Sequence, residues 1–184
     1  LTKIESDGSI RPLLAQSWTV TPDNKTWAFK LRQGVKFHNG EPFNAATVKF
    51  SFERAGAPGS VNKDKAMFAN ILNIASTDDH TVILTLKNPN PDFLFQLGQT
   101  TASIVEPKSV ASNNTQPAGT GPFRLEAWNK GSSVVLSRWD GYRDAKNVKL
   151  RRVTIRFISD AAAQVASLLS GDVDAFPRVA AARS

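Results

Sequence analysis

His38 and His80 are the side chains best suited to acid–base or metal chemistry near neutral pH. They lie 42 residues apart and form no H-E-x-x-H pattern. Two histidines leave a zinc ion short of ligands, because zinc sites use three or four protein side chains. The favoured interpretation places both histidines in turns at the surface, with a metal pair formed by tertiary contact as the alternative. No metal or cofactor is expected.

Neighbouring carboxylates occur twice, at Asp78 and Asp79 and again at Asp172 and Asp174. Asp78 and Asp79 fall in a predicted turn, where aspartates usually bond the amides of that turn. Neither pair is flanked by the second acid or base that hydrolysis needs, and G-x-S-x-G and phosphate-loop motifs are absent. No catalytic residue is predicted. The enzyme alternative is a hydrolase that assembles carboxylates or His38 in three dimensions.

The densest glycine motif is Gly119-Thr120-Gly121-Pro122-Phe123. Pro122 offers no amide hydrogen to an anion, and the residues that follow alternate as a strand instead of opening a helix. Glycine permits a positive φ, so we expect a tight backbone bend that leads into a strand. Anion binding at this motif is the lesser alternative.

Apolar periodicity indicates the elements that must position these side chains. Alternation predicts strands at residues 27–31, 35–37, 74–77, 81–87, 103–105, 123–128, 133–138, 150–158 and 173–176. Helical spacing predicts helices at residues 44–55, 65–72, 93–97 and 161–170, and a helical or irregular segment at 12–18. Because adjacent strands pair as hairpins, the prediction is a mixed α/β fold of α+β character with substantial antiparallel sheet.

Basic side chains outnumber acidic ones by 23 to 16, which gives a net charge of +7. Near the C-terminal end Arg152 and Arg156 alternate with Val153, Ile155 and Phe157, which predicts a strand with a wet and a dry face. The charges are interpreted as solvated. A basic surface for nucleic acid or an acidic polymer is the alternative, but the sequence carries no nucleic-acid-binding motif.

Several classes of protein are excluded by composition. The absence of cysteine excludes a disulfide scaffold, a thiolate metal site and a thiol nucleophile. The 41% hydrophobic content is too high for a disordered chain, and no apolar run approaches the ~20 residues of a membrane helix. The chain starts at Leu1 without methionine, and we expect it to be cut from a longer protein.

Ordered sequence blocks carry a resemblance to a known family. They are LAQSWTV at 14–20, DNKTWAFKLRQGVKFHNGEPFNA at 23–45, PAGTGPF at 117–123, WDGY at 139–142 and LLSGDVD at 168–174. In type and order they resemble the family 5 extracytoplasmic solute-binding proteins, which are the peptide, nickel and oligosaccharide receptors of ABC importers. One departure from the family pattern is Thr47, where the family usually has an acidic residue.

The resemblance implies a lobe of the type II periplasmic-binding-protein fold, with a ligand cleft between it and a second lobe. The expected division is residues 1–30 in domain I, 31–148 in a family-specific domain II, and 149–184 in domain I again. Because family members extend beyond both ends, the chain is expected to be an N-terminal-lobe fragment. The resemblance also implies a periplasmic or extracytoplasmic location, with or without a lipid anchor, and a monomeric intact protein.

The stretch after predicted helix 93–97 borders the ligand space in the family. The implied ligand contacts are Gln99, Thr100, Thr101 and Ser103. Their small polar side chains suit hydrogen bonding, with an ordinary loop as the alternative. Met67 and Phe68 are further candidates, as an apolar wall, with core packing as the alternative.

The resemblance implies the function of a solute-binding receptor, a non-enzymatic protein that closes around a peptide or another small polar solute. Its implied partners are that solute and an ABC permease in the membrane, and no nucleic acid. Because much of the cleft lies outside the chain, these 184 residues alone are expected to bind solute weakly or not at all.

Overall fold

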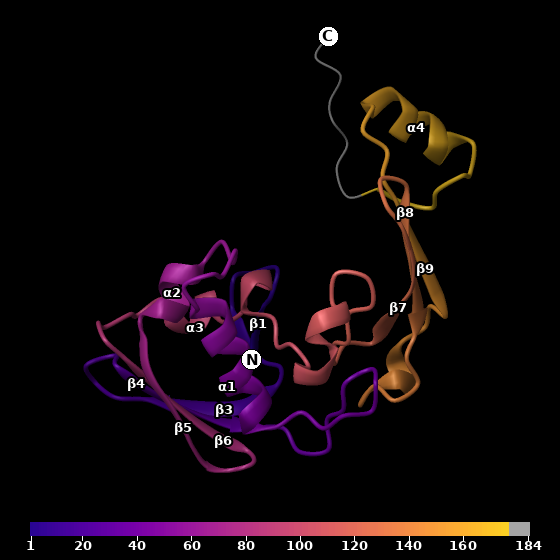
Figure 1. Ribbon diagram of the computed structural model, residues 1–184. Coiled ribbons are helices and arrows are strands. Elements are labelled where there is room, and N and C mark those ends of the chain that lie inside the picture. The colour runs from indigo at the N-terminus through magenta and orange to yellow at the C-terminus, as the bar shows by residue number, and fades with distance from the viewer. Residues whose placement is uncertain (177–184) are drawn as a thin grey trace.

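The computed structural model describes residues 1–176, whose strands form one two-stranded, one four-stranded and one three-stranded sheet (Figure 1). The first elements are β1 (Thr2–Ile4), β2 (Ile10–Pro12), β3 (Ala15–Val20), β4 (Thr26–Leu31), α1 (Ala45–Gly56), α2 (Lys65–Ala69), β5 (Ile71–Asp78), β6 (Thr81–Leu86) and α3 (Phe93–Gln96). They are followed by the 3-10 helices η1 (Thr100–Ala102) and η2 (Pro107–Ser112), then β7 (Phe123–Asn129), β8 (Ser133–Arg138), the 3-10 helix η3 (Ala145–Asn147), β9 (Arg152–Arg156) and α4 (Ala161–Leu169).

The four-stranded sheet has the antiparallel order β3-β4-β6-β5 and holds the core. Trp27 pairs with Leu84 and Phe29 with Val82, so the alternating apolar residues of β4 and β6 share one buried face. Helix α1 packs beside β5 and β6, and its Phe52 is also buried. The hydrophobic core of the described chain lies entirely within residues 1–102.

Helix α1 is capped at its N-terminus by Asn44. The Asn44 side chain accepts a hydrogen bond from the Thr47 amide at 3.1 Å, and the Thr47 hydroxyl accepts one from the Asn44 amide at 3.2 Å. Thr47 therefore closes a reciprocal capping box without a carboxylate, and the departure from the family pattern leaves the cap intact.

The Asn44→Ala variant is expected to lose about 1 kcal/mol of unfolding free energy, because the α1 amides lose their side-chain acceptor. Urea denaturation followed by tryptophan fluorescence measures the loss. Asn44→Asp is the matched control, since aspartate caps a helix as well as asparagine does. Equal losses for the two variants would contradict a capping role for Asn44.

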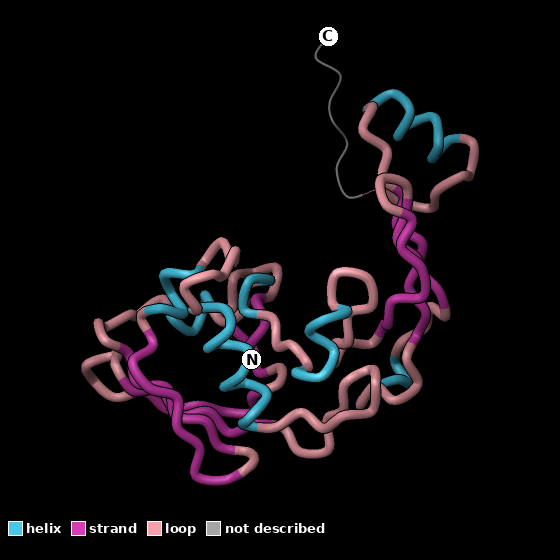
Figure 2. Tube along the Cα trace, viewed as in Figure 1, coloured by secondary structure: helices cyan, strands magenta, loops and turns pink. Residues whose placement is uncertain are grey.

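The three-stranded sheet, in the order β7-β8-β9, extends away from the rest of the chain and has α4 near its far end (Figures 1 and 2). Within the described residues, only Val135 of this sheet is a buried hydrophobic side chain. The prediction that one face of β9 is buried is wrong for the described residues, since Ile155 is exposed and Phe157 is 51% exposed. Leu169, at the end of α4, is 83% exposed.

Most predicted hairpins are confirmed, but several smaller elements differ. Residues 12–18 contain parts of β2 and β3 and no helix, and residues 35–37 form a single bridge between Lys36 and Pro42 in place of a strand. Residues 103–105 and 173–176 are not strands, and α2 ends at Ala69 because β5 begins at Ile71.

The expected domain division, whose boundaries are approximate, stays a prediction, and two strand pairings lie across those boundaries. The boundary at residue 30 falls inside β4, which pairs with both β3 and β6. The boundary at residue 148 separates β9 from β8, although these strands pair along their whole length.

Among residues 1–176, no helix has the length and apolarity needed to cross a membrane.

Candidate functional site

His38 lies where the loop after β4 meets the glycine motif that precedes β7. Its backbone amide donates to the Gly119 carbonyl at 2.9 Å, and the Gly119 amide donates to its Nδ1 at 3.2 Å. Its Nε2 lies 3.0 Å from the Gly121 carbonyl. Because Nδ1 accepts a hydrogen bond and a carbonyl can only accept, the geometry assigns the neutral ring with its proton on Nε2.

The surroundings of His38 favour the neutral ring. Burial lowers the pKa of His38 below its ordinary value of 6.5, the hydrogen bond to Gly121 raises it in part, and the Arg124 charge lowers it again. The ring also lies edge-on against Trp139, with ring centres 5.0 Å apart. His38 is therefore held by hydrogen bonds and packing, and both ring nitrogens are already occupied.

The glycine motif makes its bend differently from the prediction. Neither Gly119 nor Gly121 has a positive φ, so the expected use of glycine's left-handed conformation is wrong. A Cβ built on Gly119 meets His38 Cε1 at 3.6 Å, and one built on Gly121 meets nothing within 4 Å. The bend is held by the hydrogen bonds to His38, which occupy the Gly119 amide that an anion would need.

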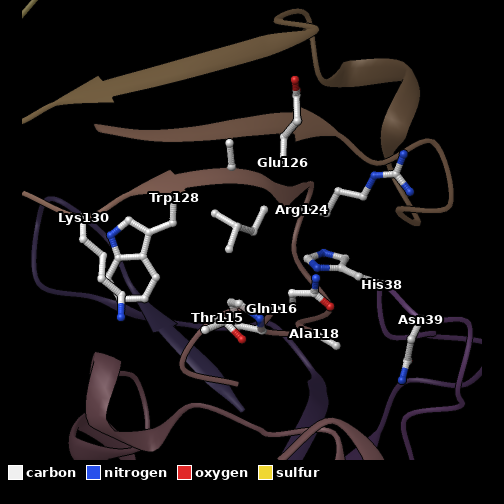
Figure 3. Close-up of a pocket in the computed structure, with 12 residues that line it drawn as sticks. His38, Asn39, Thr115, Gln116, Ala118, Arg124, Glu126, Trp128 and Lys130 are labelled. Carbon is white, nitrogen blue, oxygen red and sulfur yellow. The ribbon is translucent and has the colours of Figure 1, made fainter. Parts of the chain in front are cut away.

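A hollow of about 470 Å³ opens beside His38, between residues 115–118 and strand β7 (Figure 3). Its lining residues are His38, Asn39, Thr115, Gln116, Pro117, Ala118, Arg124, Leu125, Glu126, Ala127, Trp128 and Lys130. Figure 3 shows Trp128 and Lys130 directed toward Thr115, whereas Glu126 points away. Glu126 pairs instead with Arg152 at 2.8 Å.

The hollow places an aromatic face next to a cation. Trp128 is 44% exposed, and Lys130 Nζ lies 5.7 Å from the centre of its ring, so an aromatic face and a cation are adjacent. The lining contains no cysteine or serine nucleophile. Residues 1–176 contain no group of three His, Asp or Glu side chains that could hold a metal ion.

The predicted titratable pairs are not catalytic arrangements. Asp78 accepts from the His80 amide at 2.7 Å and the Thr81 hydroxyl at 2.8 Å, which confirms the turn interpretation. These bonds lower the pKa of Asp78, and the bond from the His80 amide contributes most to that lowering. Asp172 accepts from the Ser170 hydroxyl at 2.9 Å in the turn after α4.

The implied ligand contacts lie on and beside η1 and do not line the hollow. Gln99, Thr100 and Ser103 are exposed. Thr101 is half-buried: its hydroxyl donates to Asp64, and its carbonyl accepts from the Asn62 side chain at 2.9 Å. The stretch is thereby fixed to the loop before α2, and the Ser103 hydroxyl donates to the Thr100 carbonyl at 2.7 Å.

Met67 and Phe68 belong to the core, so their interpretation as a ligand wall is corrected. Phe68 is 3% exposed, and its ring centre lies 5.3 Å from that of Phe52. It touches the floor of a second hollow of about 330 Å³, but almost none of its surface is available to a solute. Met67 is buried in the same cluster.

Comparison with known sequences decides the family. Residues 9–183 match the family described as "Bacterial extracellular solute-binding proteins, family 5 Middle". This chain belongs to that family. The blocks around His38 and the glycine motif, which the structure joins by hydrogen bonds, both lie inside the matched range. The family consists of solute-binding proteins.

Proteins named for a ligand or solved with one are similar to this chain in sequence and fold. The chain is 34% identical over 179 residues to the glutathione-binding protein GsiB of Salmonella typhi, covering 95% of this chain and 35% of GsiB. It resembles the binding protein AgaA of A.tumefacien R10, which was solved with agropinic acid. The two structures superpose with a TM-score of 0.87 and 35% sequence identity, over 94% of this chain and 36% of AgaA. DppA of Helicobacter pylori, which was solved with the peptide STSA, superposes with a TM-score of 0.83 and 30% sequence identity, over 94% of this chain and 39% of DppA.

Some residues of the site were missed by sequence reasoning. Glu106 is buried and accepts from the Asn39 side chain and the Lys108 amide, each at 2.8 Å, so it ties the His38 loop to η2. A single glutamate before a proline gives little warning of burial. Trp128 and Lys130 were predicted only as hairpin residues, although a tryptophan on an alternating strand beside a turn is a usable signal for an exposed aromatic face.

Proposed function

We propose that this chain is part of the solute receptor of an ABC importer. The observation that carries the proposal is the family match over residues 9–183, supported by the fold shared with AgaA and DppA. GsiB binds glutathione, AgaA was solved with agropinic acid and DppA with a peptide, so the proposed ligand is a peptide or a similarly small polar solute. The permease is the proposed partner, and the protein is proposed to be a monomer without enzymatic activity.

The chain spans about a third of the length of the relatives that it matches. Apolar side chains are exposed around β9 and α4, where further residues of a larger protein would cover them. They are Ile155 on β9, Phe157 just after β9, and Leu169 on α4. We therefore propose that a second lobe, contributed by residues beyond these 184, closes over the solute. The 184 residues alone should then bind weakly, because one wall of the cleft makes only part of the contacts.

The proposed contacts on this chain are Gln99, Thr100, Thr101 and Ser103. Gln99, Thr100 and Ser103 are exposed and polar, and the bonds of Thr101 to the loop at 62–64 fix the backbone that carries them. A pre-ordered wall of this kind loses little conformational entropy on binding.

Isothermal titration calorimetry tests the proposal with glutathione, the peptide STSA and agropinic acid. We expect the protein that contains both lobes to bind at least one of these at micromolar concentration or tighter, and the 184 residues to bind it at least 100-fold more weakly. The solute should be recovered chemically unchanged. Failure of every solute with the two-lobed protein would contradict the proposed ligand class, and micromolar binding by the 184 residues would contradict the need for a second lobe.

The proposed contacts are tested by a matched pair of double variants in the two-lobed protein. Gln99→Ala with Thr100→Val is expected to weaken binding at least tenfold, because both side chains face solvent next to η1. Gln16→Ala with Thr19→Val removes the same groups from exposed positions on β3 and should leave affinity unchanged. Equal affinity of the two variants would place the solute elsewhere.

A further inference from the structure

We propose that His38 is a positioning residue that joins the loop after β4 to the three-stranded sheet only while its ring is neutral, so that this joint opens in acid. The proposal does not depend on solute binding. It rests on the place of His38 between the two sheets and on the direction of its hydrogen bonds.

His38 contacts the three-stranded sheet at two places, just before β7 and just after β8. Its ring and backbone hold Gly119 and Gly121, which lead directly into β7. Its ring also packs on Trp139, the residue after β8, and the Trp139 amide donates to the Pro122 carbonyl at 2.9 Å. The first residue of β7 pairs with the last residue of β8, so these two places are adjacent. His38 therefore contacts the sheet at one corner.

The Trp139 ring has little freedom to follow a moving His38. A Cβ built on Gly141 would lie 2.7 Å from the Trp139 ring, so the backbone of the corner after β8 is in close contact with the indole. The loop that carries His38 is itself fixed to η2, where the Asn39 side chain donates to Glu106 and Lys108 pairs with Glu41 at 2.6 Å. Movement of the His38 loop relative to the three-stranded sheet would therefore stretch the His38 hydrogen bonds.

Protonation of His38 breaks one of these bonds directly. A proton on Nδ1 would face the Gly119 amide hydrogen, so two donors would meet and the acceptor would be lost. The bond from Nε2 to the Gly121 carbonyl would remain. Acid thus converts a two-point attachment of the ring into a one-point attachment beside a repelling amide.

The charged groups around the ring give a new positive charge little support. Arg124 on β7 is the charged group that acts on His38 directly, and its sign opposes protonation. On the same wall of the hollow Lys130 lies over Trp128. The third charged side chain of that wall, Glu126, is paired with Arg152.

The carboxylates of the other neighbouring elements already have partners. Asp140, next to Trp139, pairs with Arg138 at 2.9 Å, and Glu41 pairs with Lys108. Glu106 accepts from the Asn39 side chain and the Lys108 amide. Protonated His38 would therefore draw on carboxylates that are already engaged.

The sign of the pH dependence follows from the lowered pKa of His38. Above pH 6.5 the ring is neutral whether the joint is closed or open, and the joint keeps its full stability. As the pH falls below 6.5, an opened or unfolded His38 binds a proton that the closed joint resists. The closed joint therefore weakens as the pH falls below 6.5 and reaches its minimum below the pKa of the closed form.

The test uses the absence of cysteine, which lets spin labels be placed at chosen sites. Thr19→Cys on β3 and Ser132→Cys in the β7–β8 turn are exposed positions on the two sheets. Pulsed electron paramagnetic resonance on the labelled 184-residue chain should give a narrow distance distribution at about pH 8 and a broader one at about pH 5. A distribution that is equally narrow at both values would overturn the proposal.

His38→Gln is the matched control, because a glutamine amide offers both an N–H donor group and an acceptor oxygen but does not titrate. It should keep the distribution narrow at both pH values, whereas His38→Ala should broaden it at both. A pH-dependent broadening in His38→Gln would assign the effect to another group. Circular dichroism on each variant separates opening of the joint from loss of fold.

A measurement on the unchanged chain keeps the proposal testable if a variant does not fold. Long-range proton–nitrogen correlation spectra of His38 should show a protonated Nε2 and an unprotonated Nδ1 at about pH 8. The Gly119 amide signal should shift through the same titration as the ring. Protonation of Nδ1 in place of Nε2, or a Gly119 amide that ignores the His38 titration, would overturn the proposal.

Discussion

Replacement of Phe29 by alanine is expected to lower the unfolding free energy of the chain by about 3–5 kcal/mol. Phe29 is 0% exposed at the centre of β4, the strand that pairs with both β3 and β6. Its ring lies 6.5 Å from the rings of Trp18 and Trp27, measured between centres. The truncation removes these contacts and leaves a cavity that rigid strands on both sides cannot close.

Urea denaturation measured by circular dichroism tests this expectation, with Phe157→Ala as the control. Phe157 follows β9 and is 51% exposed, so its truncation should cost only about 1 kcal/mol. Similar midpoints for the two variants would show that the face shared by β4 and β6 is not the centre of the core.

The Gly56→Ala variant should be destabilised by about 1–3 kcal/mol through overpacking. A Cβ on this last residue of α1 would lie 3.0 Å from the Phe68 carbonyl carbon and 3.1 Å from the Ala69 nitrogen. Both are backbone atoms of α2, which cannot rotate aside as a side chain would. The gain of roughly 0.4–1 kcal/mol that alanine brings by restricting the unfolded chain is too small to compensate.

Gly59→Ala is the matched control for Gly56→Ala, three residues further along the chain. A Cβ on Gly59 meets nothing within 4 Å, and its φ is not positive, so this variant should be neutral or slightly more stable. Thermal unfolding by differential scanning calorimetry compares the two. A neutral Gly56→Ala variant would show that α1 and α2 can separate without cost.

Local patterns predicted those parts of the fold that neighbouring residues determine. Asn44 is a helix cap by its residue type, and the alternation around Trp27 places this ring in the core, where it is 4% exposed. The turn at Asp78 and the hairpin around it follow from the same local rules. In each case the residues that decide the structure lie within a few positions of one another.

The site could not be predicted in the same way because distant residues build it. His38 bonds Gly121 across 83 residues, and Asn39 bonds Glu106 across 67. Nothing local marks these partners, so His38 was interpreted as an ordinary turn residue. The resemblance to a family supplied the fold and the class of function, but it left the hollow beside Trp128 unpredicted.

The predicted dry face of β9 failed for a different reason. The alternation of Val153 and Ile155 with arginines correctly indicates a strand that has an apolar side. Whether that side is buried depends on what covers it, and residues 1–176 leave Ile155 exposed. Periodicity in a sequence reports which face is suited to burial, not which atoms are present to bury it.

The uneven distribution of buried side chains has a consequence for the cooperativity of unfolding. The core ends at Ala102, whereas among the described residues the sheet β7-β8-β9 buries only Val135. Its backbone hydrogen bonds are therefore protected by little apolar packing, and its local unfolding requires less free energy than that of the four-stranded sheet. We therefore expect the chain to unfold as two cooperative units of unequal stability, so that a single midpoint would describe only the larger one.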